Sequence, residues 1–380
     1  MAGLKNKIES LMHAGGKSKH GVLAGLLSGA SGLYGGAVKL RDLCYRAGIF
    51  QVRSLPCRVI SVGNIAAGGT GKTPMTIYMA NLLGQMRYRP AVLSRGYKGA
   101  AEKDGAVVSD GRSLLVDSRT SGDEPMLMAC RLNGVSVLVG GNRYRSGMRA
   151  VTEFDPDIII LDDGFQHRKL HRDLDLVLID AKHGIGNGRM LPRGTLREPV
   201  SALGRCDAVV FTRSSQALQT PAIEGIRPGM PVFHADHEPY LAGVYQGNDD
   251  SALSVSGLSE SRDFSFLEQR RVFAFSGIAR NTEFRDMLES RIGRLAGFSG
   301  FADHHLYTEA DLEEIVRAFR ACGADLMVTT EKDFIRIAGR LPASVTIAVA
   351  GVKMSFTEKE EDRFAGFIRR ELAGGIKETP

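Results

Sequence analysis

A glycine-rich turn that ends in Gly-Lys-Thr is the segment of this chain best suited to chemistry. Residues 61–74 read SVGNIAAGGTGKTP and follow a largely apolar run. In a turn from strand to helix, consecutive backbone N–H groups converge on a phosphate, and the helix N-terminus adds positive potential. Lys72 would reach the β- and γ-phosphates, and the Thr73 hydroxyl would bind Mg²⁺. We therefore predict nucleotide-phosphate binding by Gly68, Gly69, Thr70, Gly71, Lys72 and Thr73.

The turn departs from the general phosphate-loop pattern at one position, where Ala66 replaces the first glycine. The alternative is a glycine-rich loop whose Lys-Thr pair has no function. A strand, the turn, Lys-Thr and a helix predicted over 75–86 nevertheless occur in the order that the mechanism requires. Phosphate binding is therefore the interpretation that we favour.

Two acidic residues supply the oxygen ligands that a metal-bound nucleotide needs. Residues 157–163 read DIIILDD, in which four apolar residues precede the acids. This pattern indicates a buried parallel strand that ends at the edge of the sheet where ligands bind. Asp-Asp-Gly is also a common turn. Given the phosphate loop, we predict that Asp162 and Asp163 bind Mg²⁺, one of them through water.

Several short motifs follow one another along the chain, and together they resemble one enzyme family. They are GGTGKTP at 68–74, SRGY at 94–97, GDEP at 122–125, DDGFQH at 162–167, NGRMLPRGTLREP at 187–199, DHH at 303–305 and TTEKD at 329–333. Over residues 40–353 the chain resembles the tetraacyldisaccharide 4′-kinases, a family that also lacks glycine at the Ala66 position. The resemblance implies a Mg²⁺-dependent kinase that uses ATP to phosphorylate the 4′-hydroxyl of tetraacyldisaccharide 1-phosphate, giving the lipid A precursor lipid IVA.

The resemblance also implies a catalytic dyad. Asp123 of GDEP would accept the hydroxyl proton with support from His304 of DHH, beside Lys72 at the phosphates. From the residues alone, Asp123 is equally suited to cap a helix that begins at Glu124. Asp303 and His305 next to His304 raise a metal-binding alternative, but a second fixed pair of histidine ligands is missing from the sequence pattern.

The remaining motif residues have roles that only the resemblance implies. Gln166 and His167 would touch Mg²⁺, the phosphates or the disaccharide, and Glu198 would join the metal ligands. Arg197 would neutralise phosphate charge, although surface Arg–Glu pairs are common and usually silent. The substrate's own phosphate would face Arg95 and Arg143. Adenine and ribose would be held by Thr329, Glu331, Lys332 and Asp333, which places the nucleotide between domains and requires closure.

Composition narrows the class of protein. With 380 residues, of which 43% are hydrophobic, the chain can bury a large core and form two domains. The cysteines are odd in number and include no C-x-x-C pair, which argues against a disulfide framework and a zinc site. The net charge of +6 suits an anionic lipid or a phosphorylated substrate. Nucleic acid ranks last as a partner because no basic run is interleaved with aromatic residues.

Apolar runs alternate with helical patterns, which predicts an α/β fold. Strands are predicted at 58–62, 91–94, 135–139, 157–161, 174–179 and 208–212, with crossover segments between them. We expect a P-loop NTPase-like, mostly parallel sheet and a second, smaller α/β domain. That domain would contain strands near 272, at 326–329 and at 345–350, and helices at 282–291 and 309–321. The predicted division is 1–45 for a membrane-associating segment, 46–213 for the kinase core, 214–261 for a linker with room for a β-hairpin, and 262–380 for the smaller domain.

The N-terminal segment suggests a membrane surface. Residues 21–38 carry no charge and contain six glycines, with Lys17 and Lys19 before them and Lys39 and Arg41 after them. The glycines lower both the hydrophobicity and the helix propensity of the segment, which argues against a helix that spans a bilayer. Basic flanks suit anionic headgroups, so we predict an interfacial helix at the cytoplasmic face of the inner membrane. A signal peptide and a helix packed on the protein's own core are the alternatives.

Two other classes of function share part of this pattern. A P-loop GTPase switch or partition-type ATPase would share Lys72, Thr73 and Asp163, but the Asn-Lys-x-Asp base-reading motif of GTPases does not occur in the sequence. A membrane-attached scaffold would need none of the acidic residues. Dependence on an acceptor distinguishes these classes, since a kinase consumes ATP together with its lipid acceptor.

Overall fold

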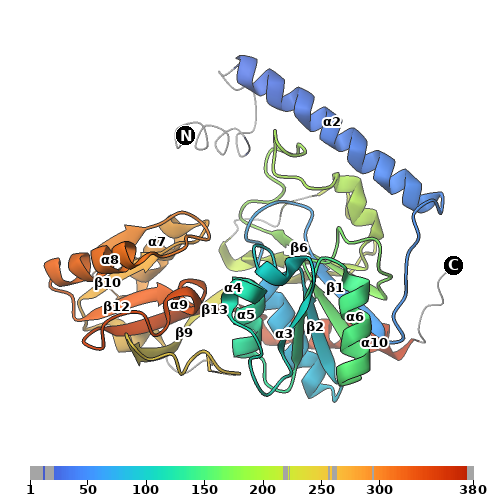
Figure 1. The fold of residues 1–380 in the computed structure, drawn as a ribbon. Coiled ribbons are helices and arrows are strands. Elements are labelled where there is room, and N and C mark those ends of the chain that lie inside the picture. The colour runs from blue at the N-terminus through green and yellow to red at the C-terminus, as the bar shows by residue number, and fades with distance from the viewer. Residues whose placement is uncertain are drawn as a thin grey trace. The chain divides into compact units, whose positions relative to one another are not determined.

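A computed structural model describes residues 12, 21–216, 221, 223–255, 257–258, 263–292 and 295–374 (Figure 1). The chain forms two compact units that alternate along the sequence. The first comprises 1–76, 156–237 and 354–380, and the second comprises 77–155 and 238–353. The predicted division at 45, 213 and 261 stays a prediction.

The first unit contains parallel strands in the order β5-β1-β6-β7-β8. They are β1 (Arg58–Gly63), β5 (Ile158–Asp162), β6 (Leu174–Asp180), β7 (Ala208–Thr212) and β8 (Val232–His234). Most of their residues are buried, as expected of parallel strands covered on both faces. The short helices η2 (Val200–Arg205) and η3 (Ser214–Gln216) flank β7, and α10 (Glu358–Ala373) packs Phe364 against Phe233 of β8 at 5.0 Å between ring centroids. Because β1 and β5 are parallel neighbours, with Val62 opposite Asp162, the phosphate loop and the acidic pair leave the same edge.

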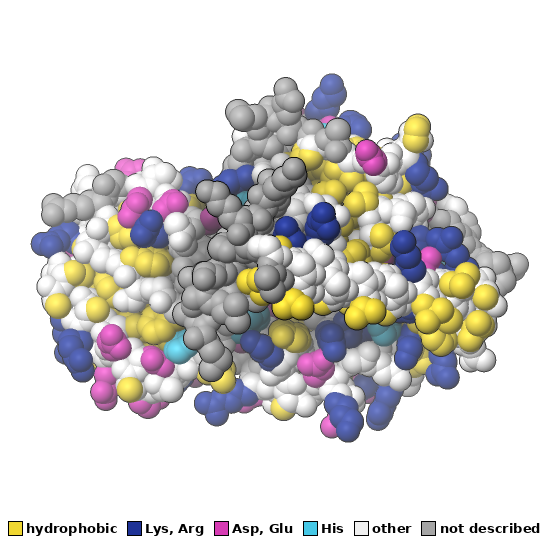
Figure 2. Space-filling view, turned by 90° about the horizontal axis from the view of Figure 1, so that it is seen from above, with side chains coloured by type: hydrophobic (Ala, Val, Ile, Leu, Met, Phe, Trp, Pro, Cys, Tyr) yellow, Lys and Arg dark blue, Asp and Glu magenta, His cyan; other side chains and the backbone are white. Residues whose placement is uncertain are grey.

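The N-terminal helix α2 (Gly21–Arg46) contains the whole uncharged segment. It is attached to the 187–198 loop through Ser31, whose hydroxyl donates to Met190 O at 2.9 Å, and Tyr34, whose hydroxyl donates to Arg197 O at 3.0 Å. The face of the molecule that carries α2 shows hydrophobic side chains among Lys and Arg (Figure 2). The exposed large apolar residues of this helix are Leu26, Leu33, Tyr34, Leu40 and Leu43. Among the described helices, none has both the length and the apolar character needed to span a bilayer. Lys17 and Lys19 lie outside the described residues.

The second unit contains two groups of strands. β2 (Pro90–Ser94), β4 (Ser136–Val139) and the antiparallel β3 (Ala106–Ser109) are accompanied by η1 (Ala100–Glu102), α4 (Ser118–Ser121), α5 (Asp123–Arg131) and α6 (Arg143–Phe154). A five-stranded sheet has the order β11-β10-β12-β13-β9, built from β9 (Asp236–Gln246), β10 (Val272–Ser276), β11 (Leu295–Gly300), β12 (Leu326–Thr330) and β13 (Thr346–Ser355). Its helical segments are η4 (Phe264–Leu267), α7 (Asn281–Ile292), α8 (Glu309–Ala321) and α9 (Glu331–Ile337).

The α/β class and the mostly parallel sheets are confirmed. Each predicted strand and helix is present, with ends shifted by a few residues at most, except that α2 continues beyond the uncharged segment to Arg46 and β13 continues to Ser355. Within the 214–261 segment, β8 and β9 belong to different sheets and do not pair with each other as a hairpin. The pattern also did not predict β3, β11, α9 and α10.

Candidate active site

The phosphate loop connects β1 to α3 (Lys72–Gln85) in the order that the sequence predicts. Gly68 and Gly71 have φ angles of 128° and 85°, a region that glycine enters without a Cβ clash. The Asn64 amide donates to the Thr70 hydroxyl at 3.0 Å across the loop. Ala66, in place of the usual first glycine, is buried in a core cluster with Leu196. The departure at this position therefore has a packing explanation.

The acidic pair follows β5 and lies against the start of α3. Asp162 is buried, and the Thr76 hydroxyl donates to its Oδ1 at 3.2 Å. Asp163 has a left-handed φ of 52°, and its Oδ1 lies 3.6 Å from Lys72 Nζ. The next residue must be glycine, because a Cβ on Gly164 would stand 2.6 Å from Leu161 Cβ. The structure thus brings Lys72 and Asp163 together as predicted.

Arg197 and Gln166 join this group. The Arg197 guanidinium donates to both oxygens of Asp163, at 2.9 and 3.1 Å. The Gln166 amide donates to Asn64 O at 2.7 Å, at the entrance of the phosphate loop. His167 is on the same turn, with its backbone N–H bonded to Gly164 O at 2.8 Å. Positive and negative side chains thus alternate beside the cradle.

Some of the residues that are predicted to bind the metal are suitable ligands for Mg²⁺. Thr73, Asp162 and Asp163 offer the hard oxygen donors that this ion prefers, and it usually takes only one or two carboxylates together with substrate phosphates. Within the described residues, no three His, Cys, Asp or Glu side chains gather as a metal-binding group. Glu198 is 1% exposed and is paired with Arg41 Nη2 at 2.5 Å and with Arg205. Its place among the metal ligands stays a prediction, and those ion pairs would have to rearrange.

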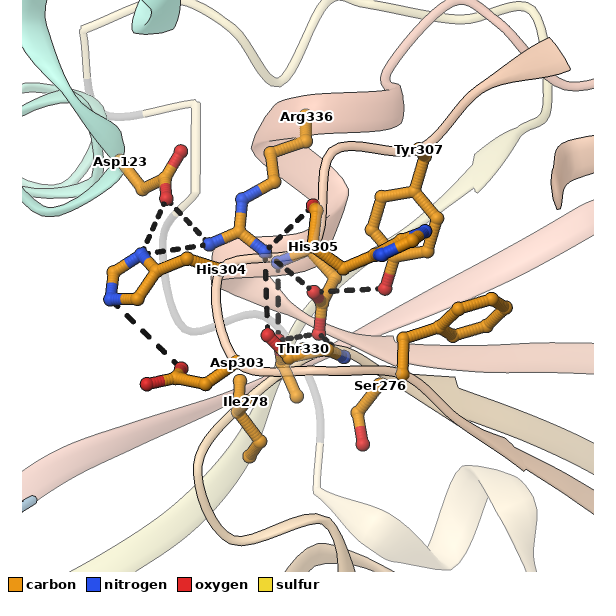
Figure 3. A network of polar contacts seen from close by, with 12 residues as sticks. Asp123, Ser276, Ile278, Asp303, His304, His305, Tyr307, Thr330 and Arg336 are labelled. Carbon is orange, nitrogen blue, oxygen red and sulfur yellow. Dashed lines mark hydrogen bonds and ion pairs between the residues drawn. The ribbon is translucent and has the colours of Figure 1, made fainter. Parts of the chain in front are cut away.

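The predicted dyad is formed within the second unit (Figure 3). His304 Nδ1 lies 3.2 Å from Asp123 Oδ2. Asp123 is the first residue of α5, whose cap is Gly122 without a side-chain hydrogen bond, so the structure gives Asp123 no capping bond. His304 is in the loop between β11 and α8, with a left-handed φ of 59° and its N–H bonded to Gly277 O at 3.1 Å. This backbone geometry directs the imidazole to Asp123.

Arg336 is a third member of this site that the sequence did not reveal. Its Nη2 donates to Asp123 Oδ2 at 2.5 Å, and its Nη1 donates to Asp333 Oδ1 at 3.1 Å. The side chain is 6% exposed. Because Arg336 is on α9 three residues after Asp333, the helical spacing of the TTEKD motif was the available signal.

Electrostatics keep Asp123 ionised. Burial raises the pKa of this carboxyl, but hydrogen bonds from His304 and Arg336 outweigh burial and lower the pKa to about 2. In return, the carboxylate raises the pKa of Arg336 against the opposing effect of burial. At neutral pH, Asp123 is therefore a carboxylate that accepts hydrogen bonds.

The TTEKD segment supports the loop that carries His304. Asp333 is fully buried and accepts from Gly277 N at 3.0 Å and from the hydroxyls of Thr330 at 2.7 Å and Tyr307 at 3.0 Å. Burial raises the pKa of Asp333 and that of Tyr307. These bonds tie β10, α9 and the 301–307 loop together. The TTEKD segment thus holds the dyad in place.

The other residues of the predicted adenine site are also engaged within the protein. The Thr329 hydroxyl donates to Phe275 O at 2.9 Å, and Glu331 accepts from the Tyr240 hydroxyl at 2.5 Å. Burial raises the pKa of Glu331. Lys332 Nζ donates to Glu124 Oε1 at 2.5 Å. Their role in holding adenine and ribose stays a prediction.

The two arginines predicted to face the substrate's phosphate, Arg95 and Arg143, have hydrogen-bond partners within the second unit. Arg95 Nε pairs with Glu102 Oε1 at 2.6 Å. Arg143 is buried at the start of α6, where its Nη1 donates to Gly140 O at 2.7 Å. His305, considered above as a metal ligand, has its Nε2 3.1 Å from Asp311 Oδ2. A role for Arg95 and Arg143 in substrate binding stays a prediction.

Comparison with known proteins decides the family. The family model described as tetraacyldisaccharide-1-P 4′-kinase, LpxK, matches residues 23–373. The chain belongs to this family. A relative from Desulfatibacillum aliphaticivorans named tetraacyldisaccharide 4′-kinase is 36% identical, over 99% of this chain and all of the relative. One of the same name from Syntrophus aciditrophicus is 42% identical, over 82% and 84% of the two chains.

The fold of the LpxK family extends over most of the chain. The structure of LpxK from Aquifex aeolicus in complex with ATP has 33% sequence identity to this chain and a TM-score of 0.70. The match covers 92% of this chain and 99% of the other. The α/β architecture, the family and the kinase class predicted from the motifs are therefore confirmed.

Proposed function

We propose that this chain transfers the γ-phosphoryl group of ATP to the 4′-hydroxyl of tetraacyldisaccharide 1-phosphate, giving lipid IVA. The contact between ionised Asp123 and His304 carries the proposal. A nucleotide switch needs a phosphate loop, but it has no use for a second carboxylate–imidazole pair that accepts a proton from a sugar hydroxyl. The names of the relatives support this substrate.

The phosphate loop supplies binding and charge neutralisation. Backbone N–H groups of Gly68, Gly69 and Gly71 would hold the β-phosphate, and Lys72 would extend to the γ-phosphate. Asp163 now pairs with Lys72 and Arg197. Arriving phosphate would compete with Asp163 for these cations, which directs the carboxylate to the metal side of the site. Lys72 and Arg197 would therefore bind the phosphates in place of Asp163 when the nucleotide binds.

Proton removal falls to the dyad. The 4′-oxygen forms the new bond to γ-phosphorus, the bond from γ-phosphorus to the β–γ bridging oxygen breaks, and the hydroxyl proton passes to Asp123. A carboxylate of pKa about 2 is a weak acceptor on its own. In a loose transition state little proton transfer is required early, so a weak base that is always ionised suffices. His304 supports the carboxylate after protonation, and Arg336 keeps it oriented.

Mg²⁺ is the metal that the donor set fits best. Thr73, Asp162 and Asp163 would hold it beside the cradle. When bound, the ion neutralises charge on the β- and γ-phosphate oxygens.

The lipid acceptor implies work at a membrane surface, and α2 suits this role. We infer that the exposed side chains of Leu26, Leu33, Leu40 and Leu43 enter the headgroup region of the cytoplasmic leaflet, with Lys39 close to anionic lipid. The attachment of α2 through Ser31 and Tyr34 supports this reading, because it leaves the leucines exposed.

Product analysis tests the proposed function. Purified protein is incubated with ATP, Mg²⁺ and tetraacyldisaccharide 1-phosphate, and the lipid is examined by mass spectrometry and by ³¹P NMR. The expected product carries a new phosphomonoester at the 4′ position. A lipid that remains unmodified while ATP is consumed would contradict the proposal.

A further inference from the structure

Thr212, the last residue of β7, and Arg213, which follows it, donate hydrogen bonds to backbone carbonyl groups of the phosphate loop. The Thr212 hydroxyl donates to Thr70 O at 3.0 Å, and Thr212 is fully buried. Arg213 Nη2 donates to Gly69 O at 3.3 Å. Neither residue lies in one of the family motifs.

These bonds determine where the N–H groups of the loop point. A peptide unit is planar, so a bond that fixes the carbonyl of Thr70 also fixes the N–H of Gly71 on the opposite side. The peptide between Gly69 and Thr70 is fixed at both ends, because Thr70 N–H also donates to Gly68 O at 3.1 Å. A cradle binds an anion only when its carbonyls face away from it. Thr212 and Arg213 restrain the loop in this orientation, because they donate hydrogen bonds to its carbonyl oxygens.

Arg213 is itself held on three sides. Its Nη1 donates to Asp180 Oδ2 at 2.7 Å, and its Nε donates to His237 Nδ1 at 3.1 Å. Asp180 ends β6 and also accepts the backbone N–H groups of Lys182 and His183, at 3.0 and 3.2 Å. The side chain of Arg213 is 11% exposed, and its φ of 54° is left-handed. Unusual backbone geometry of this kind is tolerated where the surroundings over-determine it.

His237 closes the same arrangement against the last glycine of the loop. A Cβ built on Gly71 would stand 2.1 Å from His237 Nε2, so the imidazole packs directly on this backbone. Because Arg213 donates to the other ring nitrogen, one guanidinium orients the ring that contacts Gly71 and also bonds the carbonyl of Gly69. The two ends of the glycine segment are thereby linked.

We propose that Thr212 and Arg213 are positioning residues for the nucleotide, which hold the phosphate loop in its anion-binding shape before ATP arrives. The proposal rests on the nucleotide-binding part of the proposed function. A preformed cradle serves the ground state and the transition state alike, so its loss raises KM for ATP and leaves kcat nearly unchanged. A merely structural role would lower the fraction of folded enzyme, and apparent kcat would fall at constant KM.

Three variants test the proposal. Thr212→Val removes one hydrogen bond while keeping a β-branched residue in β7. Arg213→Gln removes the guanidinium and its hydrogen bonds to Gly69 O, Asp180 and His237. Loss of one or two such bonds predicts a rise in KM for ATP of about five- to tenfold for Thr212→Val, and more for Arg213→Gln. Arg213→Lys keeps the charge but lacks the planar fork, so it is expected to stay defective. The matched control is Arg227→Gln, which removes a guanidinium that donates to Cys206 O at 3.2 Å in the same unit.

Calorimetric titration with Mg-ADP, without lipid acceptor, provides the second readout. ADP affinity is expected to fall in parallel with the rise in KM, and the thermal midpoints of Thr212→Val and Arg227→Gln should stay close to that of the parent protein. Wild-type ADP affinity in Thr212→Val and Arg213→Gln would overturn the proposal. So would full recovery in Arg213→Lys, because charge alone would then explain the effect. Because this measurement needs no lipid, its result can be interpreted even when tetraacyldisaccharide 1-phosphate is not phosphorylated.

Discussion

The guanidinium of Arg336 donates to the carboxylate of Asp123 over 2.5 Å. His304 contacts the same oxygen at 3.2 Å, and together the two groups lower the pKa of Asp123 to about 2 against the effect of burial. The proton acceptor of the proposed reaction is thus kept charged by a residue on α9. Activity is expected to depend on this arginine although no motif pointed to it.

Replacing Arg336 with glutamine should shift the acid side of the pH–rate profile. Burial raises the pKa of Asp123, and without the guanidinium only His304 opposes it. The acid limb of kcat/KM is therefore expected to move to higher pH in Arg336→Gln. Arg340→Gln is the control, since its guanidinium bonds to Glu309 and to Tyr307 O instead. Superimposable acid limbs for Arg336→Gln and the parent enzyme would contradict this account.

Asp123 should also contribute to stability in a defined pH range. Its pKa is lowered from 3.8 to about 2 on folding, so the contribution is present above pH 3.8 and is lost as pH falls through about 2. The shift corresponds to about 2 kcal/mol at most. Urea unfolding at pH 5 and near pH 2.5 should show that Asp123→Asn loses stability relative to the parent protein at the higher pH, with a smaller difference at the lower pH. A difference independent of pH would contradict the assignment.

The sequence predicted the phosphate-binding residues and the proton-accepting pair. It did not predict the residues that hold these groups in position. Gly-Lys-Thr, Asp162 and Asp163 were readable because a phosphate cradle and its acids follow strands directly in sequence. The Asp123–His304 pair came from the family resemblance, since 181 residues separate the two in the chain. Arg336, Thr212 and Arg213 were missed because the partners that define their roles, Asp123 and the carbonyls of Gly69 and Thr70, come from distant elements. The spacing of Asp333 and Arg336 is visible in the sequence, but it does not reveal the contact of Arg336 with Asp123.

Two of the residues predicted to hold adenine and ribose have bonds inside the protein that the sequence did not predict. Oxygens of Asp333 and Glu331 bond to Tyr307, Thr330 and Tyr240. A carboxylate after a strand gives the same sequence signal whether it faces a ligand or the interior. The role of Asp333 and Glu331 in holding adenine and ribose stays a prediction.

Removing the charge of the phosphate loop tests the cradle. Lys72→Ala is expected to fold normally and to lower kcat by about 10² to 10³, the usual cost of one preorganised donor to the transferred group. Steady-state kinetics with saturating ATP measures the loss, and circular dichroism monitors the fold. Lys359→Ala, on the exposed side of α10, should leave kcat unchanged. Near-normal turnover in Lys72→Ala would remove the loop from the mechanism.

Charges placed on α2 test its contact with membranes. In Leu33→Glu and Leu40→Glu, exposed leucines that are 80% and 62% accessible become acidic, so flotation with anionic phosphatidylglycerol vesicles should fall sharply. ATP binding should persist, because neither side chain is buried. Leu115→Glu alters a leucine of the second unit that is 52% exposed and serves as the charge-matched control. Equal flotation of all three variants and the parent would place the membrane contact elsewhere.

The coupling of ATP consumption to lipid phosphorylation in Asp123→Asn tests the central claim most directly. Asparagine keeps the size of the side chain and one acceptor oxygen, but it is a far poorer base. The parent enzyme should form one ADP for each 4′-phosphorylated lipid, with little ADP released when lipid is omitted. Asp123→Asn should lose lipid phosphorylation by about 10² or more while retaining its affinity for ADP. Full lipid phosphorylation by Asp123→Asn, or ADP formation by the parent at the same rate without lipid, would contradict the account.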